Sequence, residues 1–192
     1  MRKLIRKLSD MRGISGFEYR LTDQIADMFK KYCDDVKIDS LGSVIAVKRS
    51  NKPNAPKLMI EAHCDEIGLI VTSITDEGYL TFANVGGVDE RTLPSTEVTV
   101  HGKEDLWGVI GIKPNYLLEQ GKTAKLKELA VDTGLSAEKV KELVAVGDSI
   151  TLAQSVGRLG KKQFSGKSLD DRASVAAIMR VMKNIKDLDI DI

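Results

Sequence analysis

Two carboxylate-rich segments carry the residues best suited to chemistry, and the first surrounds one of only two histidines. His63 and Asp65 follow the apolar run 58–60. If that run is a strand, residues two apart point to the same face, at the strand end where α/β sheets collect ligands. A metal-binding histidine usually donates its second ring N–H to a carboxylate, and Asp65 could accept it. A structural histidine beside a turn-capping aspartate fits the same residues.

The second segment places Asp170 and Asp171 side by side, followed by Arg172, just before a predicted helix. Such acids commonly form an N-cap and a first-turn charge, with the arginine as a solvated partner. Paired acids at a helix start can also offer an oxygen to each of two metal ions about 3.5–4 Å apart. The spacing alone leaves both interpretations open.

The elements that must position these residues follow from periodicity. A capping-box pattern at 15–18 and apolar residues that recur at helical spacing from Phe17 to Phe29 predict an amphipathic helix. Residues 36–48 predict a hairpin, and residues 57–61 a short strand of the kind that a sheet buries on both faces. After Lys167 the apolar spacing again predicts a helix.

The middle of the sequence has a different texture, with β-rich runs separated by turn residues. It predicts a small antiparallel barrel or sandwich, interrupted by helices over 123–130 and 137–144, the second capped by Ser136. A strand is expected over 149–153. We expect His101 to be an exposed hairpin residue, and Trp107, Tyr116 and Cys64 to serve in packing.

The predicted fold class is therefore α/β. A central mixed sheet flanked by helices is interrupted by a β-rich, barrel-like insertion. The expected divisions are 1–68 for the first segment of the α/β domain, 69–159 for the insertion, and 160–192 for the second segment.

Composition limits the classes of partner. The chain has 192 residues and a formal charge of +1, with acidic and basic residues interspersed, so we expect neither nucleic acid nor membrane as a partner. Cys33 and Cys64 lack paired spacing, which predicts free thiols in a reducing compartment, by default the cytoplasm.

Over almost its whole length the chain resembles the dimetal, TET-type (tetrahedral) aminopeptidases, a family that includes glutamyl and deblocking aminopeptidases and cellulase M-like proteins. Their fold is zinc-peptidase-like. The likeness is carried by six segments: GISGFE (13–18), the hairpin 36–48, IEAHCDEIG (60–68), NVGGVDERTLPSTEVTVHG with WGVIGIKP, AVDTGLSAEKVKELVAVGDSI (130–150) and GKSLDDRAS (166–174).

The resemblance implies roles for individual residues. His63 would bind one metal ion, Asp65 would act in catalysis by orienting that imidazole, and Asp170 would bridge two ions, with Asp171 as the alternative bridge. The implied cofactors are two divalent ions, zinc or cobalt, or else manganese. The implied substrate is a peptide, and the insertion would assemble homodimers into a dodecamer.

The family pattern also includes a glutamate pair, a further carboxylate ligand and a last histidine, which this sequence lacks. We therefore expect an aminopeptidase site that is incomplete in this chain. Two other functions stay open: an inactive fragment that acts as an oligomerisation or interaction module, and the endoglucanase that the family label names. Glycoside hydrolysis uses two facing carboxyl groups and gives His63 no role.

From this we predict that the chain alone has no measurable peptidase activity with Zn²⁺, Co²⁺ or Mn²⁺, because two ions would lack ligands and no general base is present. An aminoacyl reporter substrate measures this. Hydrolysis that His63→Ala abolishes would contradict the expectation.

Overall fold

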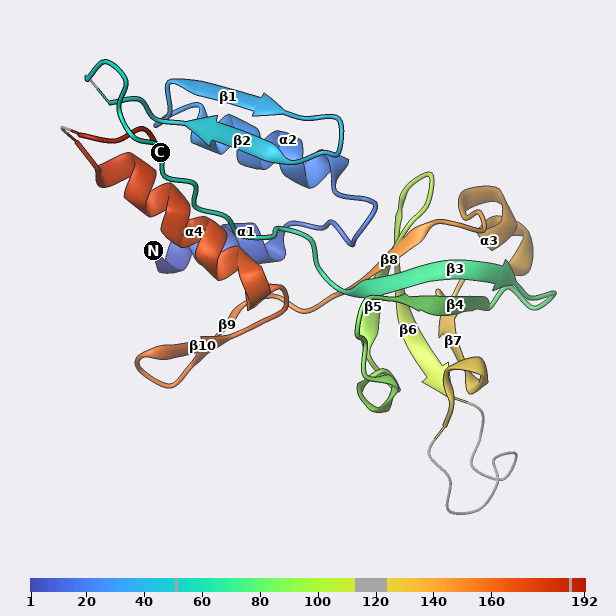
Figure 1. Ribbon diagram of the computed structural model, residues 1–192. Helices are drawn as coiled ribbons and strands as arrows, with labels where there is room; N and C mark the ends of the chain where they lie inside the picture. Colours follow the sequence, from blue (N-terminus) through green and yellow to red (C-terminus); the bar gives the residue numbers. More distant parts are fainter. Residues whose placement is uncertain (51, 113–123, 187) are drawn as a thin grey trace. The chain divides into compact units, whose positions relative to one another are not determined.

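The computed structural model describes residues 1–50, 52–112, 124–186 and 188–192, which form two compact units (Figure 1). Met1–Glu66 and Ser155–Ile192 make up the first unit, and Ile67–Gln154 the second. The α/β class with a barrel-like insertion is confirmed. The assignment of 1–68, 69–159 and 160–192 as functional domains remains a prediction.

The described residues of the first unit form three helices: α1 (Arg2–Asp10), α2 (Tyr19–Phe29) and α4 (Leu169–Asn184). Helix α2 agrees with the helix that the apolar spacing predicted. Helix α1 was not predicted, because only a short apolar face interrupts its basic residues. One core joins the three helices. Its buried residues are Ile5, Leu8, Met11, Leu21, Ile25, Phe29, Val175, Ala176, Met179 and Met182.

The strands of the first unit form two antiparallel pairs. The predicted hairpin is present as β1 (Asp35–Ile38) and β2 (Val44–Val47), and the second pair is β9 (Gly157–Leu159) with β10 (Gln163–Ser165). The β1–β2 turn closes on Asp39, whose carboxylate accepts from two backbone N–H groups of that turn. Side-chain hydrogen bonds of this kind explain why aspartate favours turns.

Residues 57–61 do not form the fully buried strand that was predicted. An isolated parallel bridge joins Lys57 to Asp191, and Ile192 pairs in turn with Lys48. In the part of the chain that the structure describes, no other strand lies along this segment. Residues 58, 59 and 60 are consequently 47%, 84% and 42% exposed.

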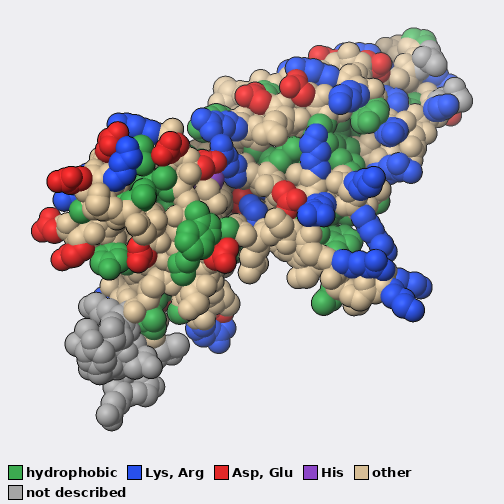
Figure 2. Space-filling view, turned by 180° about the vertical axis from the view of Figure 1, so that it is seen from behind, with side chains coloured by type: hydrophobic (Ala, Val, Ile, Leu, Met, Phe, Trp, Pro, Cys, Tyr) green, Lys and Arg blue, Asp and Glu red, His purple; other side chains and the backbone are tan. Residues whose placement is uncertain are grey.

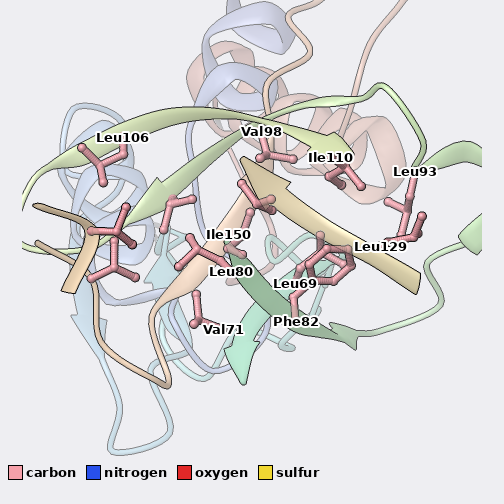
Figure 3. Close-up of a cluster of buried hydrophobic side chains, with 14 of the residues drawn as sticks. Leu69, Val71, Leu80, Phe82, Leu93, Val98, Leu106, Ile110, Leu129 and Ile150 are labelled. Atoms are coloured by element: carbon pink, nitrogen blue, oxygen red, sulfur yellow. The ribbon is translucent and has the colours of Figure 1, made fainter. Parts of the chain in front are cut away.

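The second unit is a closed antiparallel barrel with the strand order β3-β4-β7-β6-β5-β8. Its strands are β3 (Gly68–Ile74), β4 (Leu80–Val85), β5 (Glu97–His101), β6 (Asp105–Ile112), β7 (Leu129–Asp132) and β8 (Ser149–Leu152). Alternate side chains point inward, as strand geometry requires. Figure 3 shows side chains of this buried cluster, among them Leu69, Val98, Ile110 and Ile150.

Short helices accompany the barrel. Helix α3 (Ala137–Leu143) and its Ser136 cap agree with the prediction, the hydroxyl accepting from the N–H of Lys139 at 3.4 Å. The helix predicted over 123–130 is wrong where it is described. A 3-10 turn, η3 (Leu126–Glu128), leads directly into β7. Strand pairing with β6 stabilises residues 129–132 more than a helix would, because it buries their inward-facing side chains in the barrel. A second 3-10 turn, η1 (Glu90–Thr92), precedes β5.

Charge is less evenly spread in space than along the sequence. Figure 2 shows basic side chains gathered over part of the first unit. They come from α1 and the β9–β10 hairpin, which meet where Arg2 donates to the carbonyl of Lys162 at 3.4 Å. Within the described ranges, no helix has the length and apolar character that a membrane span needs.

Gly78 lies in the β3–β4 turn with a φ of +92°, and a Cβ there would lie 2.8 Å from the Cα of Ala137. Gly134 also has a positive φ, of +70°, but a Cβ there meets nothing within 4 Å. The two glycines therefore separate the cost of a left-handed backbone from the cost of a steric clash with α3.

We predict that Gly134→Ala lowers the free energy of unfolding by about 1–2 kcal/mol through backbone strain alone. Gly78→Ala should cost about 1–3 kcal/mol more, because its methyl group overlaps α3. Denaturation followed by the fluorescence of Trp107, the single tryptophan, reports on this barrel. Equal losses in the two variants would show that the close approach to Ala137 is unimportant.

Candidate metal-binding site

The sequence-predicted residues come from the two halves of the first unit. His63 and Asp65 follow the extended segment 57–62, and Asp170 lies at the start of α4. Helix α4 begins irregularly. Ser168 has left-handed backbone angles, and Asp170 and Asp171 are non-helical, so the acids form a turn that precedes the regular helix.

The imidazole of His63 lies between two carboxylates. Its Nδ1 is 3.1 Å from Oδ1 of Asp65, and its Nε2 is 3.2 Å from Oδ1 of Asp170. The second contact joins residues that are 107 positions apart. It comes from Asp170, the residue favoured from the family pattern over its neighbour Asp171. The structure thus brings together the three residues that the sequence singled out.

The outer part of this site is open to solvent. The side chain of Asp170 is 97% exposed and that of His63 is 55% exposed, whereas Asp65 is 31% exposed. Partial burial lowers the pKa of His63, but the hydrogen bond to Asp170 and the charge of Asp65 outweigh it and hold the pKa above its ordinary value. Both neighbours favour the imidazolium form, as nearby carboxylates do.

Ser15 is a member of this constellation that the sequence did not reveal. Its hydroxyl donates to Oδ2 of Asp65 at 2.5 Å. The predicted capping box is wrong, because Glu18 accepts from Gly16 N and Ser15 does not cap α2. Burial raises the pKa of Asp65, but Ser15 and then His63 outweigh it and leave the pKa below its usual range. No spacing rule links residues 50 positions apart.

A cluster of buried charged side chains lies close in sequence to His63 and Asp170. Glu66, Lys167 and Arg172 have side chains that are 4%, 11% and 0% exposed. The interpretation of Arg172 as a solvated partner is therefore wrong. Burial lowers the pKa of Lys167 and of Arg172, and the charge of Glu66 opposes that change in both.

The other residues considered in the sequence differ in how far they are buried. Cys64 is half-buried and packs against the core of the first unit, and burial raises the pKa of its thiol. His101 is only 14% exposed, not the exposed residue expected, and contacts Asp105 and Thr151. Trp107 is 58% exposed and so is not a core residue. Tyr116 lies outside the described residues.

A family model described as M42 glutamyl aminopeptidase matches residues 42–192. The chain belongs to the M42 aminopeptidase family. The resemblance inferred from the six segments is thereby confirmed.

Two solved structures and one curated relative illustrate the M42 likeness. Aminopeptidase APDkam598 of Desulfurococcus kamchatkensis superposes with a TM-score of 0.91 at 36% identity, over 98% of this chain and 53% of that one. The TET1 peptidase of Pyrococcus horikoshii, which can assemble into a tetrahedron or a large octahedral shell, superposes with a TM-score of 0.85 at 35% identity, over 99% of this chain and 58% of that one. The lysyl aminopeptidase of Pyrococcus furiosus is 33% identical over 99% of this chain and 56% of its own length.

The M42 chain spans about half the length of the curated relatives it matches. Its donor set is consistent with half of a metal site. One imidazole nitrogen with a carboxylate behind it, and one exposed carboxylate, are ligand types that zinc and cobalt accept. Among the described residues, no group of three histidine, cysteine or acidic side chains could hold an ion. Two ligands do not define a complete coordination sphere.

We predict that, without added metal, His63 titrates above its ordinary pKa and that Asp170→Asn lowers this pKa, because one of the two carboxylates favouring the cation is then neutral. The two histidine ring signals in an NMR titration measure it, and His101→Gln assigns them. An unchanged pKa in Asp170→Asn would show that the 3.2 Å contact is not populated in solution.

Proposed function

We propose that this chain contributes to a metal-dependent aminopeptidase that removes N-terminal residues from short peptides. The observation that carries the proposal is the His63 imidazole held between Asp65 and Asp170. M42 membership supports peptide-bond hydrolysis as the reaction class. Because the chain spans about half of its relatives, the activity is proposed for the protein as a whole.

In this proposal Nε2 of His63 and a carboxylate oxygen of Asp170 are metal ligands, and Asp65 orients the imidazole by accepting from Nδ1. Ser15 holds the second oxygen of Asp65 and so limits rotation of that carboxylate. When two divalent ions such as zinc or cobalt, or else manganese, are bound, they supply Lewis-acid polarisation of the scissile carbonyl and acidify a bound water. Asp170 would bridge the two ions.

We assign the β-rich unit to self-association. Trp107 and Val146 are large apolar side chains that are 58% and 64% exposed on this unit, and aromatic residues of this kind are enriched at protein interfaces. The related TET1 peptidase of Pyrococcus horikoshii can assemble into a tetrahedron or a large octahedral shell. For the whole protein, we accordingly propose a homo-oligomer, up to a dodecamer built from dimers. It would act on peptides in the cytoplasm.

A second function is favoured by one observation. Residues 58–60 present apolar side chains that are 42% to 84% exposed beside a backbone with little pairing, and exposed edges of this kind tend to pair with another chain. The chain could thus act as an interaction module. An endoglucanase role has less support, because Asp65 and Asp170 both contact one imidazole and do not face each other across a sugar site.

The decisive experiment supplies the rest of the site from a relative. Residues 1–192 replace the matching part of the Pyrococcus furiosus lysyl aminopeptidase, which aligns over 99% of this chain. With zinc or cobalt the chimera should release p-nitroaniline from lysyl-p-nitroanilide. His63→Ala and Asp170→Asn should abolish release by removing ligands, and Asp65→Asn should reduce it about 10–100-fold, the usual cost of losing a residue that orients a ligand.

Glu61→Gln is the matched control, because Glu61 is an exposed carboxylate two residues before His63. It should leave the rate unchanged. A folded, active chimera that tolerates His63→Ala would overturn the ligand assignment. A folded chimera without activity would favour the interaction module.

A further inference from the structure

Glu66 directly follows Asp65, yet its carboxylate is buried, with 4% of the side chain exposed. It accepts from Nζ of Lys167 at 2.7 and 2.9 Å, from Oγ of Ser168 at 2.5 Å and from the N–H of Gly13 at 3.2 Å. Nη2 of Arg172 lies 3.4 Å away. A carboxylate has about four acceptor positions, and these donors occupy them. Glu66 therefore offers no oxygen to a metal ion or a substrate.

Three of these donors flank Asp170 along the chain. Lys167 and Ser168 precede it, and Arg172 follows it. The backbone between them is not regular helix, since Ser168 is left-handed and Asp170 and Asp171 are non-helical. A turn without a helical hydrogen-bond ladder needs other anchors, and the Glu66 carboxylate provides them on both sides of Asp170.

Glu66 also fixes the segment that holds Asp65. Its backbone N–H donates to the carbonyl of Gly13 at 2.9 Å, and a parallel bridge pairs it with Ile14. The next residue, Ser15, donates its hydroxyl to Asp65. Glu66 therefore fixes the backbone segments that position both carboxylates in contact with His63, those of Asp65 and Asp170.

Arg172 strengthens the same arrangement from the core. Its Nε donates at 2.7 Å to the carbonyl of Cys64, the residue between His63 and Asp65. Its Nη1 donates to the carbonyls of Leu8 and Ser9, at the end of α1, and to that of Met11. The guanidinium fork is suited to several fixed acceptors at once.

From this geometry we infer that Glu66 is a positioning residue for metal binding, acting through Lys167, Ser168 and Gly13 on the spacing of His63 and Asp170. The inference rests on the proposed function, in which those two residues bind the ion. Glu66 itself stays outside the coordination sphere.

Zinc affinity of the full 192-residue chain tests the inference. Zn²⁺ alone is titrated into the protein below its unfolding temperature, and the ring signals of His63 report occupancy. We expect wild-type protein to show a saturable change, and Glu66→Gln to bind zinc about tenfold more weakly, the lower end of the usual cost for a supporting residue. Ser168→Ala removes one donor and should weaken binding in the same direction by less.

Two controls separate positioning from general loss of stability. Met182→Ala creates a void in the same core, where Met182 is 3% exposed, away from the charged cluster. Its thermal midpoint provides a stability-matched comparison. Glu61→Gln removes an exposed carboxylate close to His63 in sequence. Neither variant should change zinc affinity by more than about twofold, because each leaves the cluster around Glu66 intact.

Each outcome decides one point. Unchanged zinc affinity in Glu66→Gln, or a loss no greater than that of Met182→Ala, overturns the inference and leaves the proposed function standing. If Glu66→Gln does not fold, Ser168→Ala decides, and unchanged affinity there overturns the inference. Wild-type affinity in Asp170→Asn, or no saturable change of His63 in wild-type protein, overturns the ligand assignment and the inference with it.

Discussion

The contact of one buried carboxylate with two buried cations is the constraint on which the first unit depends. Moving a charge out of water costs several kcal/mol unless it is paired and hydrogen-bonded. Glu66, Lys167 and Arg172 meet that condition only when residues 8–13, 63–66 and 167–172 come together. Removing one partner of such a group typically costs about 3–5 kcal/mol, since an unpaired charge stays behind.

The exposed contact between His63 and Asp170, in contrast, contributes little to the free energy of folding. His63 and Asp170 are mostly in contact with water, and ion pairs in such settings contribute little to stability because solvent screens them. Their 3.2 Å contact is therefore a consequence of the buried cluster rather than a cause of the fold. This division suits a binding site. Groups that contribute little to folding can exchange a hydrogen bond for a metal ion without loss of structure.

Local pattern predicted the elements that local energetics determines. The apolar spacing before Phe29, the turn at Asp39 and the cap at Ser136 all specify structure within a few residues, and each is present. The sequence also indicated that His63 and Asp170 would converge, through the family likeness. Ser15 and Arg172 were misassigned, because their hydrogen-bond partners lie far along the chain. The residue type alone does not show whether a serine or an arginine side chain is buried. The strand β7 was missed for the same reason, since its pairing with β6 outweighs helical propensity.

The barrel explains how residues on either side of a long insertion can share one site. The insertion enters through β3 and leaves through β8, and these two strands are neighbours in the barrel, with Leu69 paired to Ile150. The points where the chain leaves the first unit and returns to it are therefore close together within the barrel. Closing a long flexible loop costs entropy that grows with its length, whereas a folded barrel holds its own ends together and leaves only short connections to order. Formation of the barrel thus lowers the entropic cost of bringing Asp170 to His63. In this architecture, the surface of the insertion can change without altering the site, provided that the pairing of β3 with β8 is kept.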